Sequence, residues 1–286
     1  MTPLIYKSLD YFALVDGHKS PGVVKKIQNT VRAASECGLQ SKSRIFQTSF
    51  SGFLEFSRSL LGSKSEVIII RFSDLVFPVV FFLMLWLRIN GKKIIVDVPT
   101  PRATGLREMS LTVRCRPKRA IRKLISYISG SWVLMPAHLI IQYATETRWF
   151  SLGLSNKTLK MGNGIIIDDN IPVSNAFWPD KTLKLVGVAQ LADWHGYDRM
   201  LYALAELRKS TPSFNISFTI VGDGVVLPHL KLLSRELSLS NVKFTGFLTG
   251  YELDMALKDA HIGVASLALY RVGLEEAAVL KTREYL

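Results

Sequence analysis

The feature that most constrains the fold is an alternation of strand-like and helix-like segments in the second half of the chain. Short apolar runs bounded by polar residues predict strands, and they occur at 182–189, 214–222, 241–247 and 261–266. Apolar positions at helical spacing follow three of these runs, at 200–207, 227–237 and 250–257. Because parallel strands need crossover connections, this order predicts an α/β fold with a parallel, doubly wound sheet.

The first half of the chain shows a similar, less regular alternation. We expect strands near 10–16, 67–71, 91–97 and 137–143, with helices at 23–37 and 75–87. The 75–87 segment is apolar on all sides but has only thirteen residues, whereas a membrane span needs about 20. We interpret it as a buried crossover helix, with a membrane-facing stripe as the alternative.

Length and composition permit two domains. A chain of 286 residues with 48% apolar content can form two cores. We predict an N-terminal Rossmann-like domain at 1–170, a linker at 171–180 and a second Rossmann-like domain at 181–286. Two cysteines exclude a disulfide framework. The N-terminus lacks the basic-then-apolar order of a secretory signal, so the expected location is the cytoplasm.

The formal net charge of +13 is concentrated in one segment, residues 102–123. Against the single acid Glu108, this segment holds Arg102, Arg107, Arg114, Arg116, Lys118, Arg119, Arg122 and Lys123. Aromatic side chains among the basic ones would favour nucleic acid, and none occurs before Tyr127. We therefore expect an anionic membrane surface as partner and no nucleic acid. An ordinary solvated basic face is the alternative.

In the last thirteen residues, the carboxylates of Glu276 and Glu284 stand eight positions apart in a segment of good helix formers. Eight residues on a helix span about 12 Å, so one helix can contact both ends of a long polyhydroxyl ligand. The free N–H groups of its first turn suit a diphosphate between them. The chain stops inside this segment without Gly, Asn or Pro, which predicts an incomplete C-terminal domain.

Several motifs occur in a fixed order and point to a family. They are Trp-His-Gly-x-Asp-Arg at 194–199, Val-Gly-Asp-Gly at 221–224, Asn-Val-x-Phe-x-Gly at 241–246, Leu-x-x-x-Arg-x-Gly-Leu at 267–274 and Glu-x7-Glu at 276–284. This set resembles the donor domain of retaining, nucleotide-sugar-dependent glycosyltransferases of the GT-B architecture. The large group called family 4 is the nearest, in the bacterial branch that builds surface polysaccharides. The resemblance covers about 180–286.

The resemblance implies a GT-B fold with a cleft between two Rossmann-like domains and an incomplete second domain. It also implies site residues. The catalytic candidates are His195, Arg199, Lys281 and Glu276. The donor-binding candidates are Gly22, Gly196, Gly222, Gly224, Val279, Leu280 and Glu284. On the acceptor side the candidates are Arg71, Asp97, Thr100 and Asn163.

In the implied roles, Glu276 binds the sugar hydroxyls and Glu284 the ribose hydroxyls. His195, Arg199, Lys281 and the helix start near Val279 and Leu280 stabilise the departing diphosphate. The alternatives are a structural role for His195, a surface position for Arg199 and simple turns at the glycines.

The implied reaction moves a sugar, with retention at the anomeric carbon, from a nucleotide-diphosphate sugar to a glycan acceptor, lipid-linked in this branch. No Asp-x-Asp metal motif occurs at a plausible position, so we expect no metal and no cofactor besides the donor. The expected location is peripheral, at the inner membrane face. The competing hypothesis is a non-catalytic truncated remnant or an accessory subunit of such an enzyme.

Overall fold

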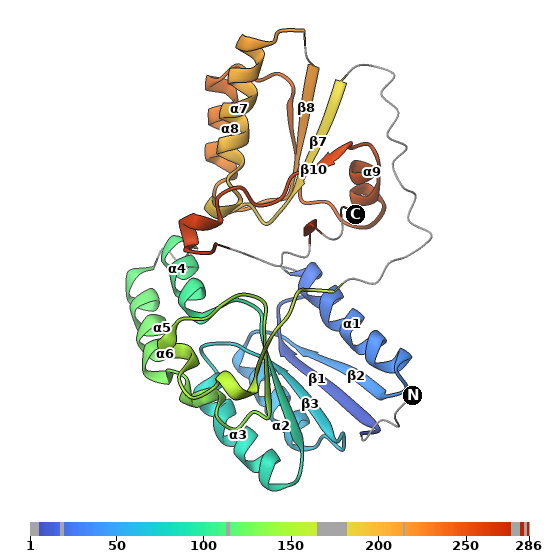
Figure 1. The fold of residues 1–286 in the computed structure, drawn as a ribbon, viewed down its shortest axis with the longest axis vertical. Coiled ribbons are helices and arrows are strands. Elements are labelled where there is room, and N and C mark those ends of the chain that lie inside the picture. Colours follow the sequence, from blue (N-terminus) through green and yellow to red (C-terminus); the bar gives the residue numbers. More distant parts are fainter. Residues whose placement is uncertain are drawn as a thin grey trace. The chain divides into compact units, whose positions relative to one another are not determined.

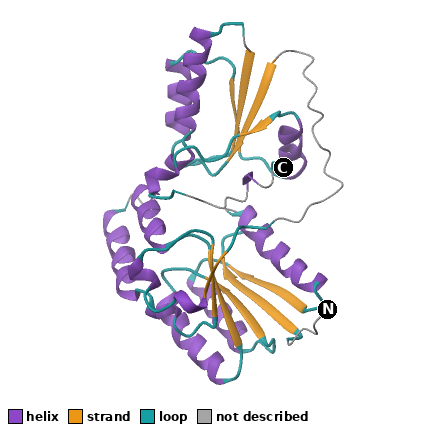
Figure 2. Ribbon diagram, in the orientation of Figure 1, coloured by secondary structure: helices purple, strands orange, loops and turns teal. Residues whose placement is uncertain are grey.

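The computed structural model describes residues 6–17, 20–112, 115–164, 182–213, 215–275, 281–282 and 285. The chain forms two compact units, Met1–Ile165 and Ile166–Leu286. Both units are α/β, each with its own parallel sheet (Figure 1, Figure 2). The linker expected at 171–180 lies outside the described residues.

The first unit contains a six-stranded parallel sheet in the order β2-β1-β3-β4-β5-β6. The strands are β1 Ser8–Leu14, β2 Gln40–Phe46, β3 Val67–Arg71, β4 Lys93–Val98, β5 Leu139–Gln142 and β6 Thr158–Lys160. The strands predicted near 10–16, 67–71, 91–97 and 137–143 are confirmed as β1, β3, β4 and β5. The carboxyl ends of parallel strands lie at one edge, so polar residues just after them meet there.

Helices cover both faces of this sheet (Figure 2). The α1 helix, Pro21–Glu36, packs with Val67 and Ile69 of β3 in one cluster. The α2 helix, Phe50–Leu61, and the α3 helix, Phe77–Ile89, pack with Ile68 and Ile70 in the other. Successive side chains of a strand point to opposite faces, which explains why β3 is apolar from Val67 to Ile70 and buried on both sides.

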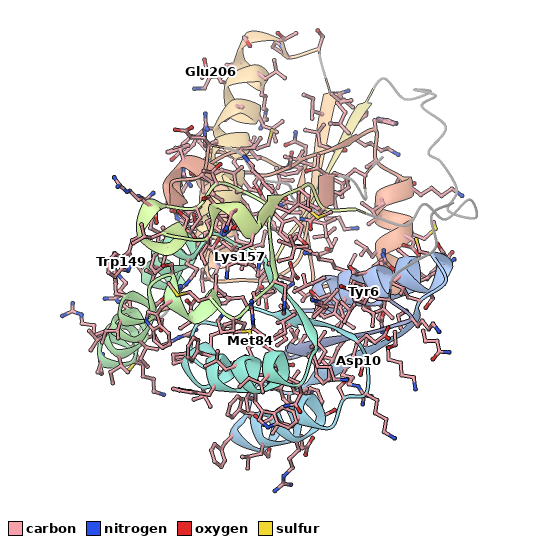
Figure 3. The ribbon with its side chains drawn as sticks, turned by 60° about the horizontal axis from the view of Figure 1, so that its bottom comes forward. Tyr6, Asp10, Met84, Trp149, Lys157 and Glu206 are labelled. Atoms are coloured by element: carbon pink, nitrogen blue, oxygen red, sulfur yellow. The ribbon has the colours of Figure 1, made fainter. Side chains whose placement is uncertain are left out.

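The α3 helix differs from its prediction. It was expected to be buried, but only one side faces the core, through Phe77, Val80, Met84 and Leu87. Met84, labelled in Figure 3, is fully buried on this side. The opposite side is exposed although it is also apolar. None of the described helices is long and apolar enough to cross a membrane.

The basic segment forms two helices, α4 Arg102–Thr112 and α5 Arg116–Ser129. The prediction that Arg102 belongs to a basic surface is wrong. Its side chain is 2% exposed and donates to the carbonyls of Gly130 and, at 2.9 Å, Ser126. Its Nε lies 3.5 Å from Asp74 Oδ1. Arg102 therefore joins α4 to the end of α5, and its charge is used inside the protein.

Three short elements complete the first unit. They are the 3-10 turns Trp132–Leu134 and Ser155–Lys157 and the α6 helix, Arg148–Ser151. Lys157, labelled in Figure 3, donates to the carbonyls of Met135 at 2.5 Å and Ala137 at 3.1 Å. This side chain fixes the connection that precedes β5.

The second unit contains a four-stranded parallel sheet in the order β10-β7-β8-β9. The strands are β7 Thr182–Val188, β8 Asn215–Val221, β9 Val242–Gly246 and β10 Ile262–Gly263. The helices are α7 Tyr197–Ser210, α8 Leu227–Glu236 and α9 Gly250–Lys258. All four predicted strands are present, but the one expected at 261–266 is reduced to two residues. Leu201, Leu204, Leu230 and Leu233 of α7 and α8 pack against Phe218 and Ile220 of β8 in the core.

Candidate functional site

In the second unit, the loop after β7 carries the first group of predicted residues. It ends in a 3-10 turn, Asp193–His195, followed by Gly196 in the left-handed conformation with φ +66°. The backbone N–H of Ala192 donates to His195 Nδ1 at 3.1 Å. Since Nδ1 accepts a hydrogen bond, the neutral ring carries its proton on Nε2 and offers it as a donor.

The protonation of His195 is set by its surroundings. Burial, and next the charge of Lys281, lower the pKa of His195 to about 3. The ring is therefore neutral at physiological pH. Among the predicted diphosphate ligands, His195 can supply a hydrogen-bond donor but not a positive charge.

Lys281 lies close to this loop. Its Nζ is 5.7 Å from the centre of the Tyr197 ring. Within the described part of the chain, Nζ is buried and has no hydrogen-bond partner. Burial lowers the pKa of Lys281 to about 7. An ammonium group in this environment is strongly disfavoured unless an anion accompanies it.

Tyr285, one turn further on, fixes the position of this segment on the sheet. The N–H of Val188, the last residue of β7, donates to the Tyr285 hydroxyl at 2.9 Å. The ring also lies against Gly263 of β10, where an added Cβ would come within 2.2 Å of Tyr285 Cδ2. Lys281 is thereby held near the carboxyl ends of β7 and β10, where ligands bind in open α/β sheets.

A second loop, which follows β10, is bonded to the His195 loop. Arg271 makes two hydrogen bonds to the carboxylate of Asp198, at 3.0 and 2.7 Å, and a third to the carbonyl of Asp193 at 2.8 Å. Arg199 donates to the Leu267 carbonyl at 2.6 Å. Arg199 thus holds the loop while its side chain remains exposed.

The close approach of these two loops requires glycine at position 196. A Cβ at Gly196 would lie 2.8 Å from Ala268 Cβ and 2.9 Å from its nitrogen. The N–H groups of Leu267 and Ala268 donate to the carbonyls of His195 and Trp194. Gly196 therefore has a packing role.

Gly222 and Gly224 also have a structural role. Their φ angles are +124° and +157°. A Cβ would lie 1.8 Å from the Ala189 carbonyl oxygen at Gly222 and 2.1 Å from that of Leu191 at Gly224. Side chains at either position would displace the backbone of the β7 loop. These glycines bring two loops together at the carboxyl edge of the sheet.

Four predicted site residues lie outside the described residues: the catalytic candidate Glu276 and the donor-binding candidates Val279, Leu280 and Glu284. Sequence reasoning missed Tyr197, Tyr285 and the pairing of Arg271 with Asp198. Signals for two of these were present. Tyr285 directly follows Glu284, and Arg271 is the arginine of the Leu-x-x-x-Arg-x-Gly-Leu motif.

The first unit has a buried polar cluster around Asp97, at the carboxyl end of β4. Tyr11 donates a hydrogen bond to Asp97 Oδ2, and Arg71 donates to the same atom at 3.0 Å. Lys26 Nζ lies 3.7 Å from Asp97 Oδ1 and 3.7 Å above the centre of the Tyr143 ring. The structure thus brings the predicted residues Arg71 and Asp97 together, with three partners that were not predicted.

Burial dominates the ionisation of this cluster. Desolvation lowers the pKa of Lys26 to about 8, although the adjacent Asp97 opposes the shift. Desolvation also raises the pKa values of Tyr11 and Tyr143, and Asp97 adds to both shifts. The Asp97 carboxylate thus lies between two cations, hydrogen-bonded to Arg71 and 3.7 Å from Lys26. Removing it would leave two cations without their counter-charge.

The other acceptor-side candidates lie at the same edge of the sheet. Thr100 is half-buried just after β4, and Asn163 is half-buried just after β6. Gly22 lies in the first turn of α1, so the expected loop there is helical. An added Cβ at Gly22 meets no atom within 4 Å, and the packing therefore does not require glycine.

Among the described residues, no group of three or more His, Cys, Asp or Glu side chains is arranged to hold a metal ion. The cavity beside His195 is small, and the larger one is lined by none of the predicted site residues. A void of about 30 Å³ is lined by His195, Asp193, Tyr197 and His229. A larger open hollow of about 610 Å³ lies at the end of α8, beside Lys231 and Arg235.

No protein-family model matches the chain, and no curated protein matches its sequence. Solved structures do match. The chain is similar to WaaG, described as "a glycosyltransferase involved in lipopolysaccharide biosynthesis", with a TM-score of 0.58 at 13% identity over 97% of this chain and 77% of that one. A structure of trehalose-6-phosphate synthase gives a TM-score of 0.50 at 12% identity, over 90% and 77%.

The fold is of the GT-B type. At these identities the similarity shows the fold alone, and this confirms the predicted pair of Rossmann-like domains. Fold does not determine function, which must be argued from the site.

Proposed function

We propose that this protein is a glycosyltransferase that moves a sugar from a nucleotide-diphosphate sugar to a glycan acceptor. The GT-B fold supports sugar transfer, since WaaG is described as a glycosyltransferase and the structure of trehalose-6-phosphate synthase concerns enzymatic glycosyltransfer. The ordered motifs of the second unit support it independently, because they come from the sequence.

One observation carries the proposal. Lys281 is a buried amine near the carboxyl ends of β7 and β10, and within the described residues its Nζ has no hydrogen-bond partner. A buried, unpaired amine is unfavourable in the free protein and needs a functional reason. A diphosphate would supply both an opposite charge and acceptor oxygens.

The neutral His195 completes this role. Its Nε2–H can donate to a phosphate or leaving-group oxygen while Nδ1 stays bonded to the backbone of Ala192. Because two adjacent cations would repel, a neutral donor beside one ammonium group is the better arrangement. Charge that develops on the departing diphosphate is then stabilised by preorganised donors, which is the main source of rate in such reactions.

The finer assignments remain part of the proposal. Glu276 binds the transferred sugar, a hexose, and Glu284 the ribose. Transfer proceeds with retention of anomeric configuration and without a metal, in cell-surface polysaccharide biosynthesis. The acceptor is a lipid-linked glycan, and the enzyme works as a peripheral protein on the cytoplasmic side of an anionic membrane. Because Arg102 is buried, the basic residues of 107–123 supply the electrostatic attraction to the membrane.

Calorimetric titration with uridine and guanosine sugar nucleotides tests the donor site. We expect saturable binding of one nucleotide class and a loss of about tenfold or more in the variants Lys281→Ala and Glu284→Ala. Lys258→Ala and Glu252→Ala are matched controls, since both residues are exposed on α9, and should bind like the parent. The anomeric configuration of the product, read by NMR, then tests retention.

Two results would contradict the proposal. Equal binding by Lys281→Ala and the parent would remove the assigned site. Absence of binding to every nucleotide in a correctly folded protein would favour the alternative of a non-catalytic remnant or accessory subunit.

A further inference from the structure

The open hollow of about 610 Å³ at the end of α8 belongs to a different edge of the second sheet from the donor candidates. Its walls come from residues 231–244: the last turns of α8, the turn after it and the start of β9. Val242 is the first residue of β9, so the hollow begins at the amino edge of the sheet. The five residues of β9 extend over about 16 Å toward the carboxyl edge. We call this site the α8–β9 hollow.

Two basic side chains give the α8–β9 hollow its charge. Lys231 and Arg235 are exposed and four residues apart on α8, so they lie on one side of the helix. Among the described residues neither forms an ion pair, and the lining of the hollow contains no acidic residue. Like charges at this spacing repel, and an anion between them would remove the repulsion. Basic residues also favour a helix C-terminus, so the argument needs the neighbouring hydroxyls as well.

A buried hydroxyl lies in the same turn of α8. Ser234 lines the hollow and is 6% exposed. Within the described residues its Oγ has one hydrogen bond, to the Leu239 carbonyl at 3.4 Å, which is long for a hydroxyl donor. A serine hydroxyl also has two acceptor lone pairs. Ser234 therefore has unused hydrogen-bonding capacity toward a molecule in the hollow.

The turn after α8 supplies a second hydroxyl from a strained position. Ser238 has φ +53° and is the one non-glycine residue with a positive φ in the described part of the chain. Its N–H donates to the Arg235 carbonyl at 2.9 Å, and Arg208 of α7 donates to its own carbonyl at 2.6 Å. Helices commonly end with glycine in this conformation, because other side chains are strained there. Serine accepts the strain and places a hydroxyl beside the hollow, and strain of this kind is concentrated at functional sites.

An apolar floor completes the hollow. Leu239 is 5% exposed, and Val242 and Phe244 are half-buried. Ligand pockets are typically apolar with a few polar groups that fix orientation, and their volumes are about 300–1,000 Å³. Two cations and two hydroxyls around an apolar floor match a sugar ring that carries an acidic group. The ring has one apolar face, and its hydroxyls both donate and accept hydrogen bonds.

We propose that the α8–β9 hollow is a second ligand site, which binds an anionic sugar. Lys231 and Arg235 hold the acidic group, while Ser234 and Ser238 bind ring hydroxyls. The apolar face of the ring contacts Phe244. A sugar phosphate and a uronic acid share this chemistry. The site goes beyond the proposed function, because it lies at the amino edge of the sheet and uses none of the donor candidates.

Calorimetric titration with four probes tests the proposal. The probes are glucose 1-phosphate, glucuronic acid, glucose and inorganic phosphate. We expect saturable binding of one of the two acidic sugars, and binding at least about tenfold weaker for neutral glucose and for inorganic phosphate. The double variant Lys231→Gln with Arg235→Gln should lose about tenfold or more in affinity for the acidic sugar. The two acidic probes distinguish a phosphate from a carboxylate as the acidic group.

The matched control is Lys209→Gln with Lys258→Gln, which removes two exposed charges elsewhere in the second unit. It should bind the acidic sugar like the parent. Lys281→Ala should also bind it like the parent, because Lys281 belongs to the proposed donor site. Loss of nucleotide binding in that variant would therefore leave this proposal unaffected.

Ser238→Gly separates ligand binding from folding. Glycine relieves the strain at φ +53°, so the midpoint of urea denaturation should rise. Affinity for the acidic sugar should fall by about threefold or more, because a hydroxyl contact is lost. A purely structural role for this turn would change the midpoint alone.

Several results would overturn the proposal. Neither acidic sugar binding to the correctly folded parent would remove the site. Equal binding by the Lys231 and Arg235 double variant and the parent would remove the assigned charges, and binding lost only in Lys281→Ala would place the probe in the donor site. Inorganic phosphate that binds as tightly as the acidic sugar would reject recognition of the ring.

Discussion

The substitution Lys281→Met should stabilise the free protein and weaken donor binding. Burial lowers the pKa of Lys281 from 10.5 to about 7. Between these values the unfolded chain holds a proton that the folded chain has released. The free energy of unfolding therefore rises with pH over this interval, by at most about 1.36 kcal/mol per pH unit. At and below pH 7 the full penalty opposes folding.

The size of the effect follows from the two pKa values. Their difference, 10.5 minus 7, is 3.5 and corresponds to an upper bound of about 5 kcal/mol. Local relaxation and water penetration reduce such penalties, so we expect Lys281→Met to gain about 1–3 kcal/mol at pH 7. The gain should shrink as pH rises and vanish near pH 10.5, where lysine is neutral in both states.

Urea denaturation of the parent and Lys281→Met at pH 6, 7, 8 and 9 measures this difference. Lys258→Met, at an exposed site on α9, is the control and should change stability by less than about 0.5 kcal/mol. A less stable Lys281→Met protein would refute the reasoning, because it would show that the amine has a stabilising partner. A gain in stability that does not depend on pH would refute the assigned pKa.

Two further predictions concern structure. Gly222→Ala should lower the free energy of unfolding, measured by urea denaturation, by more than about 2 kcal/mol, because its Cβ would clash with the Ala189 carbonyl at a positive φ. The control is Gly105→Ala, in open space on α4, which should leave the free energy of unfolding unchanged or raise it by up to about 1 kcal/mol. Equal effects would contradict the role of Gly222 in loop packing. In the first unit, Asp97→Asn should lower the free energy of unfolding by about 3 kcal/mol or more in the same assay, because it leaves Lys26 and Arg71 without their shared carboxylate. A loss of under about 1 kcal/mol would contradict this role of Asp97.

Much of the fold could be predicted because parallel α/β sheets leave a strong pattern. The β3 and β4 strands are buried on both faces and therefore read as continuous apolar runs. The glycines at positions 196, 222 and 224 also lie, as predicted, in loops at the carboxyl edge of the sheet in the second unit. Edge strands lack this signal. The β2 strand, Gln40–Phe46, lies at the edge of its sheet and is largely polar, so no apolar run predicted it.

The site could be predicted only where short motifs recur, and the sequence could not reveal which groups face each other. Arg102 was counted with the surface charges because a linear segment does not show burial. In the structure, its guanidinium joins α4, the end of α5 and Asp74 across separations of 24 to 28 residues. The same limit applied to Lys26, which is far from Asp97 in the sequence and lies 3.7 Å from its Oδ1 in the structure.

The α3 and α5 helices show where composition misleads in the opposite direction. An apolar helix next to a strand was expected to be buried, and a basic helix was expected to be an electrostatic surface. Packing assigns the sides differently. The α3 helix buries only the side that contacts β3 and β4, and α5 buries Ser126, whose hydroxyl donates to Asp74 and whose carbonyl accepts from Arg102. The apolar side chains on the outer sides of both helices are exposed among the described residues. That arrangement is stable in water at the cost of exposed apolar area, which is the expected result when a surface is selected for a partner.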